Sequence, residues 1–189
     1  LTGSFLNAQE EAGTAEKEWE AMIKECEELT AKKRHYEAIE VGKKSAKIAA
    51  DKYGKENWRV GKSILVMSLA YKKLGTVDPA KKEIAASGFK RAKAIFNKAA
   101  ESGASEAQFY LGVMYYEGVG VTKDDAEAVK WYRKAAEQGE STAQHNLGVM
   151  YAEGEGVAED DVEVVQWYGK AGDQGLADAK AMLKKLGIE

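Results

Sequence analysis

The sequence predicts an all-α protein built from stacked antiparallel helix pairs. A segment of 36 residues occurs twice in succession, at residues 105–140 and 141–176, and a repeat of this length is typical of helical hairpins. Within each copy the apolar residues recur at helical spacing. The chain contains a single proline and 19 glycines, and repeat glycines such as Gly118 and Gly139 fall where helices are expected to end. A lone helix pair cannot bury both of its faces, so successive pairs are expected to stack into a solenoid.

Residues 1–12 are excluded from the predicted fold. Leu1 to Ala8 reads LTGSFLNA and is followed by a polar segment. Two interpretations are open. The segment is either the end of a secretory signal peptide cut after Ala8, which predicts an exported or periplasmic protein, or a disordered tail, which predicts a cytoplasmic one.

Residues 13–103 are expected to form the first helix pairs. A helix is predicted at 14–31, and the next two are predicted from His35 to Tyr53 and from Lys62 to Leu74. The apolar stripe of the first helix consists of Trp19, Met22, Ile23, Cys26 and Leu29.

An insertion of about a dozen residues, 76–87, follows these helices and is long for a connection between packed elements. Asp78 and Pro79 are the residue types that begin a helix, as cap and first-turn residue. We therefore expect an extra or extended helix at 78–102, with Gly88 as a candidate site for a kink.

Residues 104–189 contain the two repeats and a capping helix at 177–187. In the first repeat, a helix at about 105–117 is followed by a second helix with Asp124 as its N-cap, Glu127 completing a capping box, and Gly139 ending it. The second repeat has the same residue types 36 positions later. Gly112 and Gly148 fall in mid-helix, where glycine costs roughly 1 kcal/mol relative to alanine, and this predicts close approach of a neighbouring helix backbone.

Composition excludes several classes of function. The net charge is −3 and the pI about 5.7, so no global basic field attracts nucleic acid. The charge is uneven, roughly +2 over residues 1–88 and −5 over residues 89–189. No apolar run approaches the roughly 20 residues that span a bilayer. Cys26 is the only cysteine, which excludes an intrachain disulfide and favours a small buried hydrophobe.

No residue pattern indicates catalysis, a metal or a cofactor. His35 and His145, the two histidines, have no second ligand at helical spacing. The glycine pairs Gly118/Gly120 and Gly154/Gly156 lack the remaining residues of a phosphate-binding loop. The paired aspartates that begin the second helices are better explained as caps. We expect no catalytic residue.

The two repeats resemble Sel-1-like repeats, a subclass of the tetratricopeptide superfamily. The resemblance rests on the patterns A-x-x-x-L-G-x-M-Y, G-x-G-V and W-Y-x-K-A-x-x-Q-G, each present twice within residues 105–176. In the second copy Gly169 and Gly172 replace Arg133 and Ala136. Residues 33–102 resemble the longer tetratricopeptide repeats of kinesin light chain type, through Y-x-x-A-I, Y-G-K-E-N and L-A-x-Y-K-K-L-G.

This resemblance implies a right-handed superhelix whose concave side is lined by the first helix of each pair, and a role as a protein- or peptide-binding adaptor. Many bacterial relatives are exported. A self-associating structural module is the alternative. Some cysteine-rich relatives are linked to penicillin binding or hydrolysis, but they pair cysteines between helices, so a β-lactamase-like hydrolase is a remote alternative here.

The first helices place a set of residues on the expected concave face. We expect a partner to contact Phe109, Val113, Tyr116, His145, Val149, Lys62, Leu65, Leu69 and Lys72. Exposed apolar residues of this kind often mark binding sites, although packing between repeats is an alternative explanation for Phe109. Lysines concentrate in the N-terminal half, which predicts either a solvated helix face or a groove for an acidic peptide.

Overall fold

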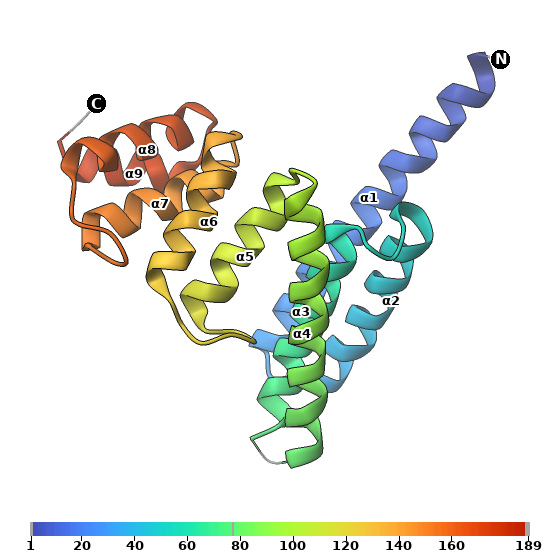
Figure 1. The fold of residues 1–189 in the computed structure, drawn as a ribbon. Helices are drawn as coiled ribbons and strands as arrows, with labels where there is room; N and C mark the ends of the chain where they lie inside the picture. The colour runs from blue at the N-terminus through green and yellow to red at the C-terminus, as the bar shows by residue number, and fades with distance from the viewer. Residues whose placement is uncertain (1, 77, 188–189) are drawn as a thin grey trace. The chain divides into compact units, whose positions relative to one another are not determined.

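The computed structural model describes residues 2–76 and 78–187, with side chains from residue 13 onward. In this part of the chain it consists of nine α-helices and no strand (Figure 1), which confirms the all-α prediction. The helices are α1 (Thr2–Ala31), α2 (His35–Tyr53), α3 (Trp58–Leu74), α4 (Pro79–Glu101), α5 (Ser105–Glu117), α6 (Asp125–Glu137), α7 (Ser141–Glu153), α8 (Asp161–Asp173) and α9 (Ala177–Lys185). We call α1, α3, α5, α7 and α9 the A helices, and the four others the B helices.

The chain divides into two compact units, Leu1–Lys98 and Ala99–Glu189, called unit 1 and unit 2 below. The sequence placed the boundary slightly later, between residues 103 and 104. The end of α4 belongs to unit 2, and there the carbonyl oxygen of Ala100 accepts a hydrogen bond from the side-chain amide of Gln108 in α5, at 3.4 Å.

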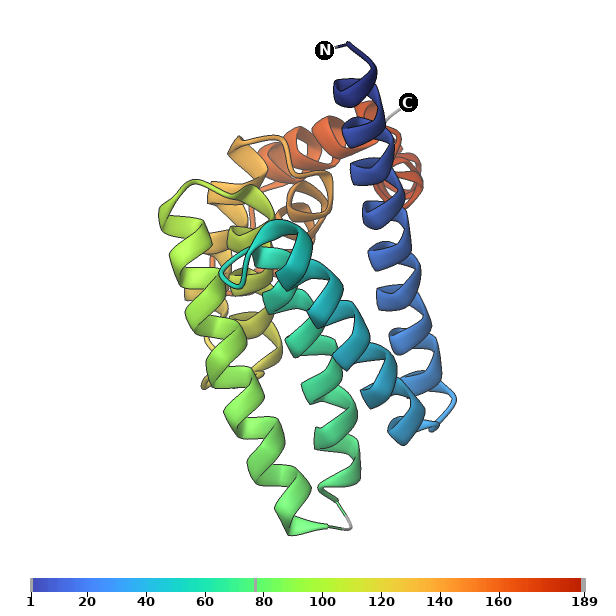
Figure 2. The same ribbon diagram turned by 90° about the vertical axis from the view of Figure 1, so that its right-hand side faces the viewer.

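Unit 1 contains α1 to α4, and Figure 2 shows these helices as neighbouring rods joined by short turns. Residues 2–12, which the sequence analysis left out of the fold as a disordered tail or the end of a signal peptide, continue α1 as helix, while residue 1 lies outside the described part. Helix α3 begins at Trp58, earlier than predicted, because the side chain of Asn57 caps it by accepting from the backbone N–H of Arg59 at 3.0 Å.

The insertion before α4 extends that helix. Asp78 accepts a hydrogen bond from the N–H of Ala80 at 3.0 Å and Pro79 is the first helical residue, as predicted. The helix then runs without a break through Gly88. A Cβ atom on Gly88 would lie 1.9 Å from Oγ of Ser68, so this glycine permits close packing of α4 on α3.

A single cluster of large side chains joins α1 to the start of α3. Trp19 is buried, donates to Oγ of Ser63 at 2.9 Å, and meets the ring of Trp58 edge-on at 5.6 Å. The guanidinium of Arg59 lies 4.5 Å from the centre of the Trp58 ring and donates to Oε1 of Glu16 at 2.8 Å. Because these contacts occur once, they leave no repeated pattern in the sequence from which they could be predicted.

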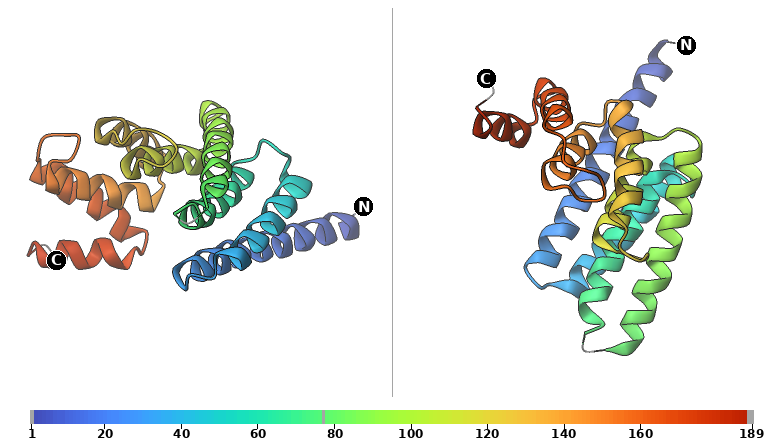
Figure 3. Two further views of the ribbon diagram at one scale, coloured as in Figure 1. Left: turned by 90° about the horizontal axis from the view of Figure 1, so that it is seen from below. Right: turned by 60° about the vertical axis from the view of Figure 1, so that its left-hand side comes forward.

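Unit 2 contains α5 to α9, which pack as consecutive hairpins closed by α9 (Figure 3). The same turn follows α4, α6 and α8. Gly103, Gly139 and Gly175 have φ values of 89°, 91° and 91°, a conformation that costs other residues steric energy. The 36-residue repeat in the sequence therefore corresponds to a backbone conformation that recurs at each of these turns.

The N-caps of α6 and α8 confirm one of the two hydrogen bonds of the predicted capping box. Asp124 accepts from the N–H of Glu127 at 2.9 Å, and Asp160 accepts from that of Glu163 at 3.2 Å. The carboxylates do not reach back as predicted, because the N–H of Asp124 already donates to the carbonyl of Tyr115 at 3.0 Å. Glu127 instead bonds Lys130.

The mid-helix glycines of the repeats are close-packed, as predicted, but the neighbour is a side chain. A Cβ atom on Gly112 would lie 2.5 Å from Cδ1 of Tyr132, and one on Gly148 would lie 2.8 Å from Cδ1 of Tyr168. The predicted backbone approach is wrong: each glycine leaves room for a tyrosine ring from the B helix of its own pair.

A buried glutamine in each repeat links consecutive pairs, and the sequence analysis missed it. Gln144 is 4% exposed, and its amide donates to the carbonyl of Ala136 at 3.0 Å. Its own carbonyl oxygen accepts from Gln174 at 2.8 Å. Gln108 makes the equivalent bonds with Ala100 and Gln138. The recurrence of both glutamines at a spacing of 36 was the available signal.

Candidate functional site

A hollow of about 230 Å³ opens on the A-helix side of unit 2, between α5, α6 and α7, and we call it the unit-2 hollow. Its lining residues are Val113, Tyr116, Glu117, Tyr132, Asn146, Val149 and Met150. The predicted contact residues Val113, Tyr116 and Val149 are thus brought together on one surface. All three are partly exposed, so a ligand could contact their side chains.

Two other predicted residues, Phe109 and His145, lie one turn earlier on α5 and α7 and are partly buried by packing within their own pairs. The ring centre of Phe109 is 5.9 Å from that of Tyr132, and that of His145 is 5.3 Å from that of Tyr168. Burial lowers the pKa of His145. Packing within the helix pair therefore explains much of why an apolar residue, Phe109, occupies this position.

The groups around the unit-2 hollow are acidic and aromatic. Burial and a hydrogen bond to Glu155 raise the pKa of Tyr116. Burial also raises the pKa of Tyr132, whose hydroxyl bonds Asn146. The ammonium of Lys123 lies 5.2 Å from the centre of the Tyr116 ring. The tyrosine hydroxyls thus stay protonated near neutral pH and can donate or accept hydrogen bonds.

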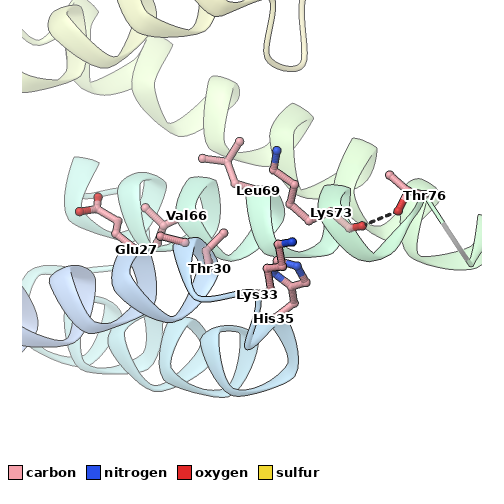
Figure 4. A pocket seen from close by; sticks show the side chains of 9 residues that line it. Glu27, Thr30, Lys33, His35, Val66, Leu69, Lys73 and Thr76 are labelled. Carbon is pink, nitrogen blue, oxygen red and sulfur yellow. Dashed lines mark hydrogen bonds between the residues drawn. The ribbon is translucent and has the colours of Figure 1, made fainter.

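A second hollow, of about 570 Å³, lies in unit 1 where α1 ends, α2 begins and α3 passes, and we call it the unit-1 hollow. It is lined by Glu27, Thr30, Ala31, Lys33, His35, Val66, Leu69, Lys73 and Thr76. Figure 4 shows Glu27 toward one end and Lys33, His35 and Lys73 toward the other. The floor includes Val66, which is 6% exposed.

Only part of the predicted contact set on α3 faces this hollow. Leu69 lines it, and Lys62 lies partly buried on the same helix face. The prediction is wrong for Leu65, a core residue that is 5% exposed, and Lys72 is exposed but does not line the hollow.

Helix geometry explains this difference. At about 100° per residue, positions 62, 66, 69 and 73 share one face of α3, whereas 65 and 72 lie roughly 70° to 90° from the centre of that face. Val66 and Lys73 therefore take the places that were assigned to Leu65 and Lys72. Burial lowers the pKa of Lys62, and the nearby carboxylates Glu27 and Glu20 partly oppose that effect.

Lys33 has an unusual backbone. Its φ is 62°, and among the described residues it alone has a positive φ without being glycine. The turn has the hydrogen bonds Lys33 N–H to Thr30 O and Arg34 N–H to Leu29 O, at 3.1 and 2.8 Å. The turns at Gly103, Gly139 and Gly175 have the same pattern. Lys33 thus occupies a glycine position, at a cost of roughly 1–2 kcal/mol.

Cys26, which was also considered for chemistry, is part of the core. Cys26 is fully buried, its thiol donates to the carbonyl of Ala38 at 3.1 Å, and burial raises its pKa to about 11. This confirms the prediction of a small buried hydrophobe. In the part of the chain described, no three His, Cys, Asp or Glu side chains are grouped to hold a metal ion. Among the described helices none has the length and apolarity of a membrane span.

Comparison with known proteins identifies the repeats. A family described as Sel1 repeat matches residues 105–140 and 141–176, the two segments found by periodicity. The chain resembles the crystal structure of a Sel1 repeat protein from Oxalobacter formigenes, with 35% identity over 61% of this chain and 82% of that one, at a TM-score of 0.47. The comparison with curated proteins found no match.

Two further solved structures are similar. One is c5321, a protective antigen of uropathogenic Escherichia coli strains that displays an SLR fold. It is 30% identical, with a TM-score of 0.53, over 94% of this chain, which spans 37% of that protein's length. The other is Helicobacter pylori cysteine rich protein B, at 23% identity and a TM-score of 0.49, covering 66% of this chain and 97% of that one.

The likeness of residues 33–102 to kinesin light chain repeats remains a prediction. The identity of the later repeats is settled by their match at 105–140 and 141–176 together with the hairpin fold. Residues 105–176 are therefore two Sel1 repeats, which belong to the tetratricopeptide-like helical repeats.

Proposed function

We propose that this protein is a non-enzymatic scaffold that binds a protein or peptide through the faces of its A helices. Sel1 repeat proteins are helical scaffolds that generally mediate protein interactions. The observation that carries the proposal for this chain is the unit-2 hollow, in which Val113 and Tyr116 of α5 and Val149 of α7 meet while still partly exposed. A concave apolar surface with a few polar groups is typical of a binding site.

Two side chains that could have suggested catalysis are packed into the structure. The thiol of Cys26 is buried and protonated at neutral pH, so it is a poor nucleophile. His145 is packed against Tyr168, and burial favours its neutral form.

The test is affinity capture from the source cells with matched valine variants. Val113→Ser places a hydroxyl in the unit-2 hollow, and Val162→Ser makes the same change on α8, where the side chain is 75% exposed. We expect Val113→Ser to recover much less partner than the wild type, and Val162→Ser to recover an equal amount. Thermal melts establish that both variants are folded. Equal recovery by all three proteins would refute the assignment of this surface.

Self-association is the second candidate, and the charges of the two units favour it. Unit 1 has 20 lysines and arginines against 14 aspartates and glutamates, a net charge of +6, whereas unit 2 has 8 against 17, a net charge of −9. Opposite charges of this size attract copies of the chain at low ionic strength. Light scattering at 20 mM and 500 mM salt would reveal a salt-sensitive dimer, and a monomer at both would exclude this alternative.

A further inference from the structure

The unit-1 hollow contains cationic groups that have no acidic partner. Among the described residues, neither Lys33 nor Lys73 forms an ion pair, and both side chains are exposed at the hollow. Glu27 lies toward the other end of the hollow, where its charge acts on Lys62. One end of the hollow is therefore positively charged and open to an anion.

The start of α2 adds further donors at this end. The N-cap residue Arg34 makes no capping bond with its side chain, so the first N–H groups of α2 are not capped. His35, the first helical residue, lines the hollow, and its Nδ1 atom is buried without a hydrogen-bond partner. An uncapped helix start beside two ammonium groups favours a bound negative charge.

The backbone of Lys33 is unusual for a residue at such a turn. Three turns of unit 2 with the same hydrogen bonds use Gly103, Gly139 and Gly175. Glycine would adopt this backbone conformation at a lower free-energy cost. Lys33 adopts it without gaining an ion pair. Strained residues of this kind cluster at functional sites, and here the strained residue lines a hollow.

We infer that the unit-1 hollow binds an acidic peptide, whose carboxylate lies between Lys33 and Lys73 and whose neighbouring aliphatic side chain rests on Val66 and Leu69. The inference rests on the proposed binding function and specifies the chemistry of one partner segment. The volume of about 570 Å³ lies within the range of pockets that hold small ligands. A charge-assisted bond to an ammonium group then gives the site its preference for carboxylates.

The binding experiment uses the full chain labelled with ¹⁵N and the blocked peptide acetyl-Leu-Asp-Leu-Glu-amide. We expect saturable shifts of the amide signals of Lys33, His35 and Thr76, which weaken at 500 mM salt. The neutral analogue acetyl-Leu-Asn-Leu-Gln-amide and inorganic phosphate are the comparison ligands. Equal shifts with the neutral analogue, or with phosphate alone, would overturn the inference, because the site would then not select an acidic peptide.

The decisive variant is Lys33→Gly, which removes the cation and relieves the backbone. We expect its melting temperature to rise by about 2 °C or more, while the Kd for the acidic peptide increases about fivefold or more. Lys32→Ala removes an exposed charge one residue away, which pairs with Glu28, and should leave the Kd unchanged. A Lys33→Gly variant with unaltered affinity would refute the role of Lys33.

The outcome is separable from that of the capture experiment. If Val113→Ser loses the cellular partner while the acidic peptide fails to bind unit 1, the scaffold function stands and only the inference about the unit-1 hollow fails. If the acidic peptide binds and its affinity depends on Lys33, the inference holds whatever Val113→Ser does.

Discussion

Units 1 and 2 join their helices by different means, although each consists of A and B helices packed in sequence. In unit 2 the joints repeat, with a glycine beneath a tyrosine ring in each pair and a glutamine bridge between pairs. In unit 1 the corresponding joint is a single cluster around Trp19, Arg59 and Glu16. Because the contacts between helices repeat in unit 2, they can be predicted from a single sequence. The cluster in unit 1 occurs once and is found only in the structure.

One device is nevertheless common to both units. A Cβ atom on Gly61 of α3 would lie 2.8 Å from Cε1 of Phe96 in α4. This is the same relation that Gly148 has with Tyr168. The glycine lies near the start of its helix in unit 1 and in mid-helix in unit 2. The physical requirement, space for an aromatic ring, is thus shared while the position in the helix is not.

The largest expected effect comes from filling that space. Gly148→Leu should destabilise unit 2 by about 3 kcal/mol or more, because the leucine must displace a buried ring, and Gly61→Leu should have a comparable effect on unit 1. Urea denaturation measures both. Gly169→Ala is the control, since a Cβ atom there meets nothing within 4 Å, and it should stabilise α8 by up to about 1 kcal/mol. If Gly61→Leu left the stability of unit 1 unchanged, Gly61 would not be needed to make space for the ring of Phe96.

A smaller loss is expected from the glutamine bridge between the helix pairs of unit 2. Gln144→Leu removes the bond to the carbonyl of Ala136 and leaves the amide of Gln174 without its acceptor. We expect a loss of about 1–2 kcal/mol. Gln174→Ala, at an exposed position, should cost less than Gln144→Leu. Equal costs for the two variants would contradict the view that burial gives Gln144 its importance.

These differences explain how far the sequence could predict the structure. The repeats, their helix bounds and the face containing Val113, Tyr116 and Val149 follow from periodicity, because each feature occurs twice. Leu65 and Lys72 were misplaced because unit 1 offers no second copy against which to fix the rotation of α3. Lys33 gave no signal at all, since a left-handed residue is inferred from glycine, and here the residue is lysine.

The N-caps of the B helices test whether equivalent residues contribute equally. Asp160→Ala should cost about 1 kcal/mol, because it frees the N–H groups of Val162 and Glu163. Asp124→Ala, which frees one such group, should cost the same or slightly less. Asp161→Ala removes the same charge without a capping bond and serves as the control. Thermal unfolding detects these differences, and an Asp161→Ala effect as large as that of Asp160→Ala would assign the stabilisation to charge alone.

The smallest expected effect concerns a position where the two repeats differ, Phe109 in the first and His145 in the second. Burial against Tyr168 lowers the pKa of His145, an effect that Asp178 partly opposes. The unfolded chain therefore binds a proton near pH 6.5 that the folded chain does not, and stability must fall as the pH is lowered through that value. His145→Phe removes this contribution and restores the residue type of the first repeat. Calorimetric melts at pH 5, 6, 7 and 8 should show a weaker decline for the variant, with the carboxylates common to both proteins contributing equally. Parallel declines would mean that His145 is as easily protonated in the folded protein as in the unfolded chain, and that its contact with Tyr168 does not exclude the charged form.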